Sequence, residues 1–177
     1  MKLFKRAATL SLLFFASFAT VASAEPATHA PNFSFKDIEG RQHQFAEYRG
    51  KWVIVNYWAT YCGPCVAELP ALNSIARRYK DKVVVLGMEA GETPTADLKQ
   101  FAAQRRISYP VVPTQDSTMF ALGLIYGVPT TFIVNPQGQI VDTHMGAITV
   151  AQLQNYIRQD KRSSIAEEKD TCKTGVC

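Results

Sequence analysis

From Val53 to Cys65 the sequence reads VIVNYWATYCGPC. Its first six residues form a nearly continuous apolar run, which is typical of a strand covered on both faces. The residues that follow, 63–79, repeat apolar side chains at helical spacing, with Val66, Leu69 and Leu72 on the expected buried face. The segment therefore predicts a buried strand that passes directly into a helix, with Cys62 at the helix N-terminus.

A position at a helix N-terminus favours thiol–disulfide exchange by the cysteine pair. Free backbone N–H groups and the helix dipole at an N-terminus stabilise a thiolate, and the thiolate is the attacking species in disulfide exchange. Pro64 suits an early helical position because its missing N–H would have no partner there. The spacing lets Cys65 reach back to a mixed disulfide on Cys62. We interpret Cys62 and Cys65 as a redox pair.

Three other interpretations of a Cys-x-x-Cys pair remain open: a structural disulfide, half of a zinc site and a haem attachment site. Haem attachment needs a histidine after the second cysteine, and Val66 stands there. A zinc site needs a second ligand pair, for which Cys172 and Cys177 are a distant candidate. We favour redox chemistry, and we expect no cofactor and no resident metal.

Outward from this segment, the pattern indicates an α/β fold. Helices that alternate with buried strands predict a central mixed sheet covered by helices on both faces, with an N-terminal β-hairpin extension. The last two strands should be antiparallel, because Asn135-Pro136-Gln137-Gly138 is a strong turn signal. The expected strands cover residues 33–36, 42–45, 53–58, 83–88, 131–134 and 139–144, and the expected helices cover 63–79, 95–104, 116–122 and a last one from 149.

The two ends of the chain differ from the domain between them. Residues 1–24 combine a basic start, an apolar run and Ala22-Ser23-Ala24, which is the pattern of a secretory signal peptide. An uncleaved membrane anchor is the alternative. Residues 25–160 form the expected domain, and 161–177 a polar, flexible tail. We expect a periplasmic or otherwise exported protein, soluble after signal cleavage.

The tail carries a second pair, Cys172 and Cys177. Export permits disulfides, and the short spacing favours a local link. A redox pair that exchanges with Cys62, an intermolecular link or metal binding are the alternatives.

Charge argues against a nucleic-acid partner. The chain has 19 basic and 15 acidic residues. Three of the basic residues lie in the first 24, so residues 25–177 contain 16 basic and 15 acidic residues. No basic stripe with interleaved aromatic residues is visible, and we expect no nucleic-acid binding.

The segment from Trp58 to Cys65, with Glu68-Leu69-Pro70 after it, resembles the active site of thioredoxins. It is most similar to the exported TlpA/ResA-type branch, which includes the CcmG/DsbE-type cytochrome-maturation proteins. The stretch from Gly127 to Phe132 resembles the cis-proline loop of this family. The resemblance covers about residues 30–160.

The resemblance implies that Pro129 is cis and packs beside the two cysteines. The backbone of Val128 would then pair with an extended substrate segment. Other substrate contacts are expected from residues that surround the cysteines: Trp58, Tyr61, Gly63 and Pro64. For Trp58 and Tyr61, simple packing is the alternative.

One departure from ordinary thioredoxins concerns a buried acid. Thioredoxins usually have Asp two residues before the active-site Trp, and this chain has Asn56 there. The ResA-type resemblance implies a glutamate after the next strand, in a Gly-Glu pair, and Gly91-Glu92 matches it. We therefore expect Glu92 to accept the proton of Cys65. Glu89 is the nearby alternative, and both could also be solvated loop charges.

These residues predict an enzyme that reduces disulfides of exported proteins and is re-reduced by a membrane thiol donor. The family suggests apocytochrome c as a client. Gly63-Pro64 is the dipeptide of reducing thioredoxins, with potentials of about −270 mV, against about −120 mV for a strong periplasmic oxidant.

Two other functions compete with disulfide reduction. A thiol peroxidase would carry one cysteine after a Thr-x-x pattern, whereas Thr60 precedes Cys62 by only two. A metal chaperone of this fold would use a wider cysteine spacing and a partner histidine, which the sequence does not identify.

Overall fold

The computed structural model describes residues 28–158, and its centre is a five-stranded sheet in the order β5-β4-β3-β6-β7. Strand β3 pairs parallel with β4 and antiparallel with β6, so the mixed sheet is confirmed. The antiparallel pairing of β6 with β7 is confirmed as well. The strands are β3 (Trp52–Trp58), β4 (Val83–Glu89), β5 (Val111–Val112), β6 (Thr130–Val134) and β7 (Ile140–Met145).

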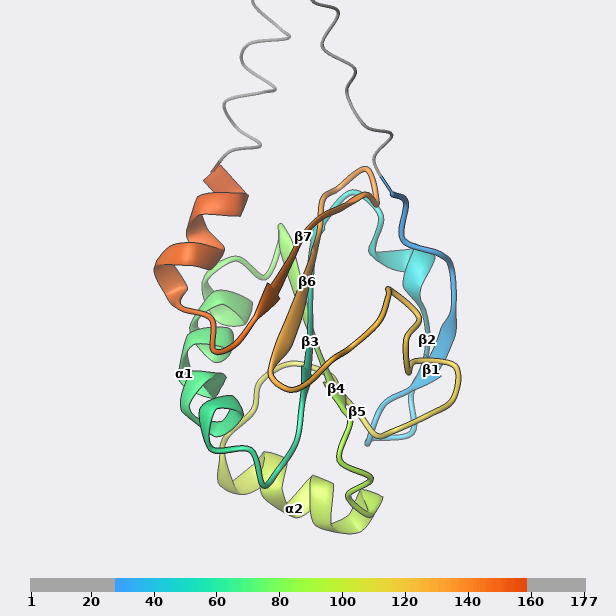
Figure 1. Ribbon diagram of the computed structural model, residues 1–177, viewed down its shortest axis with the longest axis vertical. Helices are drawn as coiled ribbons and strands as arrows, with labels where there is room; N and C mark the ends of the chain where they lie inside the picture. Colours follow the sequence, from blue (N-terminus) through green and yellow to red (C-terminus); the bar gives the residue numbers. More distant parts are fainter. Residues whose placement is uncertain (1–27, 159–177) are drawn as a thin grey trace, which may run out of the picture.

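One face of the sheet carries two helices. Helix α1 (Gly63–Arg78) and a helix over residues 150–158 lie side by side against it (Figure 1). Leu72 of α1 and Leu153 of the last helix meet Ile54 of β3 in one buried apolar cluster. Because every residue of β3 is buried, this strand holds the centre of the core and fixes where α1 begins.

Helix α2 (Thr95–Gln104) crosses one end of the sheet, below β4 and β5 in Figure 1. Its Leu98 and Ala102 are buried in a cluster with Trp58 and Cys65. The end of the sheet where β3 stops is thereby closed by α2.

The opposite face is covered by the predicted hairpin of β1 (Ser34–Lys36) and β2 (Gln42–Gln44). The single-turn 3-10 helix η1 (Phe45–Tyr48) follows β2 and is the helical element on this face. Phe35 of the hairpin packs with Tyr57 and Phe132 of the sheet. The buried carboxylate of Asp37 ties the hairpin together by accepting hydrogen bonds from the Arg41 backbone N–H and side chain.

One expectation about local structure was wrong, and one strand was not predicted. Residues 116–122 form turns rather than a helix; Phe120 has a φ of 61° and Gly123 a φ of 145°, and these left-handed conformations interrupt a helix there. Strand β5 was missed because it has only two residues and pairs only with β4.

The expected signal peptide and tail, with Cys172 and Cys177, lie outside the described residues. Between residues 28 and 158, no helix is long and apolar enough to cross a membrane.

Candidate active site

The two central cysteines form a disulfide at the start of α1. Cys62 and Cys65 are joined, with their Cα atoms 5.2 Å apart. Cys62 is the N-cap residue, and its Sγ accepts a hydrogen bond from the Cys65 backbone N–H at 3.3 Å. After reduction the same N–H and the helix dipole would stabilise a Cys62 thiolate.

Exposure separates the roles of the two sulfurs. Cys65 is fully buried, whereas Cys62 is partly exposed. A protein disulfide can therefore reach Cys62 first, and Cys65 is positioned to attack the mixed disulfide from within. This supports the roles predicted for the pair.

The loop before β6 lies against the exposed sulfur. The Val128–Pro129 peptide bond is cis, as expected from the resemblance, and the Val128 carbonyl oxygen lies 3.7 Å from Cys62 Sγ. Within residues 28–158, the Val128 backbone N–H and C=O make no backbone hydrogen bond. They remain available to an extended client segment, which would pair with the chain as an added strand.

The four other residues expected to contact substrate fall into two groups. Tyr61, Gly63 and Pro64 are exposed around Cys62. Trp58 is fully buried and packs in a cluster with Cys65 and Phe101. It supports the cysteine pair from beneath, and this conformation gives a client no access to it.

The carboxylate expected to serve Cys65 has no contact that holds it toward the pair. Glu92 is exposed with a φ of 59°, and its carboxylate makes no hydrogen bond within the described part of the chain. Gly91 has a packing role, because a Cβ there would lie 2.8 Å from the Tyr61 ring and 2.7 Å from Glu89 Oε1.

Glu89, the alternative, is 1% exposed but fully occupied by local contacts. Its carboxylate accepts hydrogen bonds from the Gly91 N–H, from the Thr93 N–H and hydroxyl, and from the Thr114 hydroxyl. These bonds fix the turn after β4, which is a structural role.

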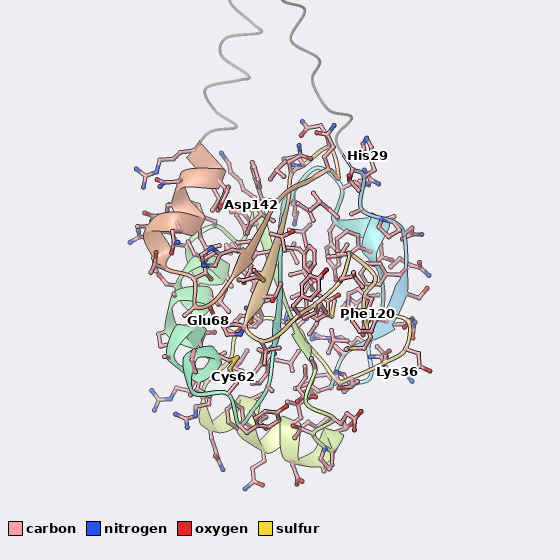
Figure 2. All side chains as sticks on the ribbon, viewed as in Figure 1. His29, Lys36, Cys62, Glu68, Phe120 and Asp142 are labelled. Carbon is pink, nitrogen blue, oxygen red and sulfur yellow. A yellow bond between two sulfur atoms is a disulfide. The ribbon has the colours of Figure 1, made fainter. Side chains whose placement is uncertain are left out.

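The buried carboxylate on the same helix face as Cys65 belongs to Glu68, one turn further along α1. Glu68 is 3% exposed, and residues three apart on a helix are neighbours, with Cβ atoms about 5–6 Å apart. Figure 2 shows Glu68 between α1 and the sheet, close above Cys62. Its Oε1 accepts from Asn56 Nδ2 at 2.8 Å, and its Oε2 accepts from the Ile148 N–H at 2.7 Å.

Burial raises the pKa of Glu68 above its ordinary value, and the hydrogen bonds from Ile148 and Asn56 offset part of that rise. A carboxylate with a raised pKa is better matched to a thiol proton than an exposed one. Asn56 stands where thioredoxins have an acidic residue. Here it donates a hydrogen bond to the buried acid, Glu68.

Sequence reasoning missed Glu68, although a signal was present. Cys65, Glu68 and Leu72 follow helical spacing on one face, so a helix that buries Cys65 also buries Glu68. A buried glutamate is rare without a partner or a function.

The described residues thus combine an accessible sulfur, a buried sulfur and an unpaired backbone segment at Val128. These are the features of a thiol–disulfide oxidoreductase with a thioredoxin fold. Comparison with known proteins agrees. Residues 26–143 match the model of the AhpC/TSA family, and the chain belongs to that family.

The similar curated proteins include a thiol-disulfide oxidoreductase ResA of Bacillus cereus, which is 32% identical over 73% of this chain and 75% of its own length. ResA of Geobacillus thermodenitrificans is 32% identical over 87% of this chain and 89% of its own length. The chain is therefore a TlpA/ResA-type thiol–disulfide oxidoreductase.

A solved structure supports the fold. The thiol:disulfide interchange protein of the thioredoxin family from Chlorobium tepidum TLS aligns with a TM-score of 0.69, over 77% of this chain and 98% of that one, at 24% identity.

Proposed function

We propose that this protein reduces disulfide bonds in exported proteins, with Cys62 as nucleophile, Cys65 as resolving thiol and Glu68 as proton acceptor. The Cys62–Cys65 disulfide at the helix start, with Cys62 Sγ facing the unpaired Val128 backbone, carries this proposal.

The reaction has two displacements. The Cys62 thiolate attacks one sulfur of a client disulfide, so a Cys62–client bond forms, the client S–S bond breaks and one client thiolate leaves. Glu68 takes the proton of Cys65, whose thiolate then attacks Cys62 Sγ and expels the second client thiolate. Two electrons pass to the client, and the protein is left with the Cys62–Cys65 disulfide.

The client segment binds beside the cis-proline loop in this account. Its backbone pairs with Val128, and exposed aromatic rings flank it: Tyr61 precedes Cys62 and Tyr126 precedes Gly127. These rings favour an extended segment with apolar side chains next to the target cysteine.

Residues 1–24 direct export as a signal peptide in this proposal, 25–160 form the catalytic domain and 161–177 are a tail. A membrane thiol donor returns the electrons. Apocytochrome c is the proposed client, as the resemblance to cytochrome-maturation proteins implies. The tail pair, Cys172 and Cys177, forms a local disulfide.

Trapping tests the proposal. Cys65→Ser removes the resolving thiol, so clients should accumulate as mixed disulfides on Cys62, detectable on non-reducing gels and by mass mapping. The matched Cys62→Ser variant should trap none. Trapping by Cys62→Ser alone would reverse the roles, and consumption of hydrogen peroxide without trapping would favour a peroxidase.

A further inference from the structure

Four arginines line one open hollow on the surface, and neither Cys62 nor Cys65 lines it. Arg77 and Arg78 end α1, Arg105 and Arg106 follow α2, and hydrogen bonds from Arg77 join the two segments. The hollow has a volume of about 660 Å³ and is completed by Pro70, Asn73 and Ser74. Along α1, Pro70 lies five residues after Cys65 and Arg78 thirteen, which are about 8 Å and about 20 Å along the helix axis.

The charge of the hollow is not balanced from within. No carboxylate lines it. Among the ion pairs of residues 28–158, none includes any of the four arginines. Four guanidinium groups in one hollow repel one another, so a bound anion would lower the free energy of the folded protein.

Two of the guanidinium groups are held in place. Arg77 Nε donates to Ser108 Oγ at 3.2 Å and Arg77 Nη2 donates to the Arg106 carbonyl at 3.4 Å. The Arg105 guanidinium carbon lies 5.4 Å from the centre of the Phe101 ring. Less side-chain entropy is therefore lost when these groups bind a ligand.

A buried amide adds a donor to the hollow. Asn73 is 8% exposed, and its Oδ1 accepts hydrogen bonds from the Ser108 N–H and hydroxyl, each at 2.8 Å. A backbone N–H can only donate, so the oxygen must face Ser108 and the NH₂ group is left over. Within the described range this NH₂ has no partner. The charged groups and the amide of the hollow therefore offer donors, as recognition of an oxyanion requires.

We propose that this hollow binds an acidic segment of a protein partner, with consecutive carboxylates on the four guanidinium groups and Asn73. The donors are spread over two helix ends, which suits a chain of carboxylates rather than one ion. Asn73 is 8% exposed, so a flat membrane surface would leave its amide unused. None of the lining residues belongs to the cysteine pair or to the cis-proline loop, so an acidic segment can stay bound while Cys62 exchanges disulfides.

The test uses the oxidised full chain and a fluorescein-labelled hexaglutamate peptide, followed by anisotropy at low salt. Arg78→Gln and Arg106→Gln should each weaken binding about threefold, and the double variant about tenfold, as expected for exposed charge pairs. Neither side chain makes a hydrogen bond within residues 28–158. Lys36→Gln is the matched control, because it removes the same charge and Lys36 is exposed on the hairpin side of the sheet (Figure 2).

Added salt should weaken hexaglutamate binding, and reduction of a small uncharged disulfide should be unchanged in all variants. Equal losses in Lys36→Gln and the arginine variants would overturn the proposal, because binding would then follow net charge alone. Equal binding of hexaglutamine would overturn it too. Arginine-dependent binding to phosphatidylglycerol vesicles without hexaglutamate binding would assign the hollow to a membrane surface and refute the protein partner.

Discussion

Glu68→Gln should slow the resolving step of the reaction and spare the attacking step. A free thiol has a pKa near 8.5 and a free glutamate near 4.3, so transfer of a proton from Cys65 to an ordinary carboxylate would cost about 6 kcal/mol. Burial raises the pKa of Glu68, and each unit of that rise removes about 1.4 kcal/mol of the cost, which is tenfold in rate. Glutamine cannot accept the proton, and Cys65 is fully buried from solvent. We expect about a hundredfold loss, at the lower end for a general base.

The aromatic disulfide 5,5′-dithiobis(2-nitrobenzoate) separates the two steps in a stopped-flow experiment. Attack by Cys62 releases the first thionitrobenzoate, and attack by Cys65 on the mixed disulfide releases the second. Glu68→Gln should slow only the second release, and Glu68→Asp should restore part of it. Glu92→Gln is the matched control and should leave both phases unchanged. Equal second-phase rates in wild type and Glu68→Gln would remove Glu68 from the mechanism, and a slow second phase in Glu92→Gln would restore Glu92.

The remaining predictions concern stability and client binding. Burial raises the pKa of Glu68 in the folded protein, so as pH rises this group ionises first in the unfolded chain. It therefore lowers stability as pH rises from about 4.3 through the folded-state pKa. Thermal melts should show Glu68→Gln gaining stability relative to wild type over that range, and a pH-independent difference would contradict this. Gly87→Ala should destabilise by about 1–3 kcal/mol in urea titrations, since its Cβ would lie 3.0 Å from both Trp58 Nε1 and the Tyr109 ring, whereas Gly63→Ala, with open space, should not. Tyr126→Ala should raise the KM for an apolar peptide disulfide about fivefold, as loss of an interface aromatic typically does, while Tyr126→Phe stays near wild type; an unchanged KM would remove this ring from the client site.

Much of this architecture could be predicted because its signals are local. The apolar run of β3, the helix after it and the position of Cys62 between them all lie within one short stretch of sequence. The last helix, expected from residue 149, also begins at a local signal: Gln152 Oε1 accepts from the Thr149 N–H, and the Thr149 hydroxyl accepts from the Gln152 N–H.

The features that the sequence did not predict depend on contacts between residues far apart in the chain. Glu68 receives a hydrogen bond from the Ile148 N–H, eighty positions along the chain, and no local pattern shows that pairing. The Gly91-Glu92 pair matched a family pattern, but its glycine makes room for the Tyr61 ring, and Glu92 is exposed to solvent.

The reduction potential of the Cys62–Cys65 pair tests the proposed direction of electron flow most directly. It can be measured by equilibration with glutathione or dithiothreitol buffers, followed by alkylation and mass spectrometry of the purified protein. We predict a potential below about −200 mV, near the reducing thioredoxins at about −270 mV. A value near −120 mV, that of a strong periplasmic oxidant, would contradict the account and make the protein a donor of disulfides.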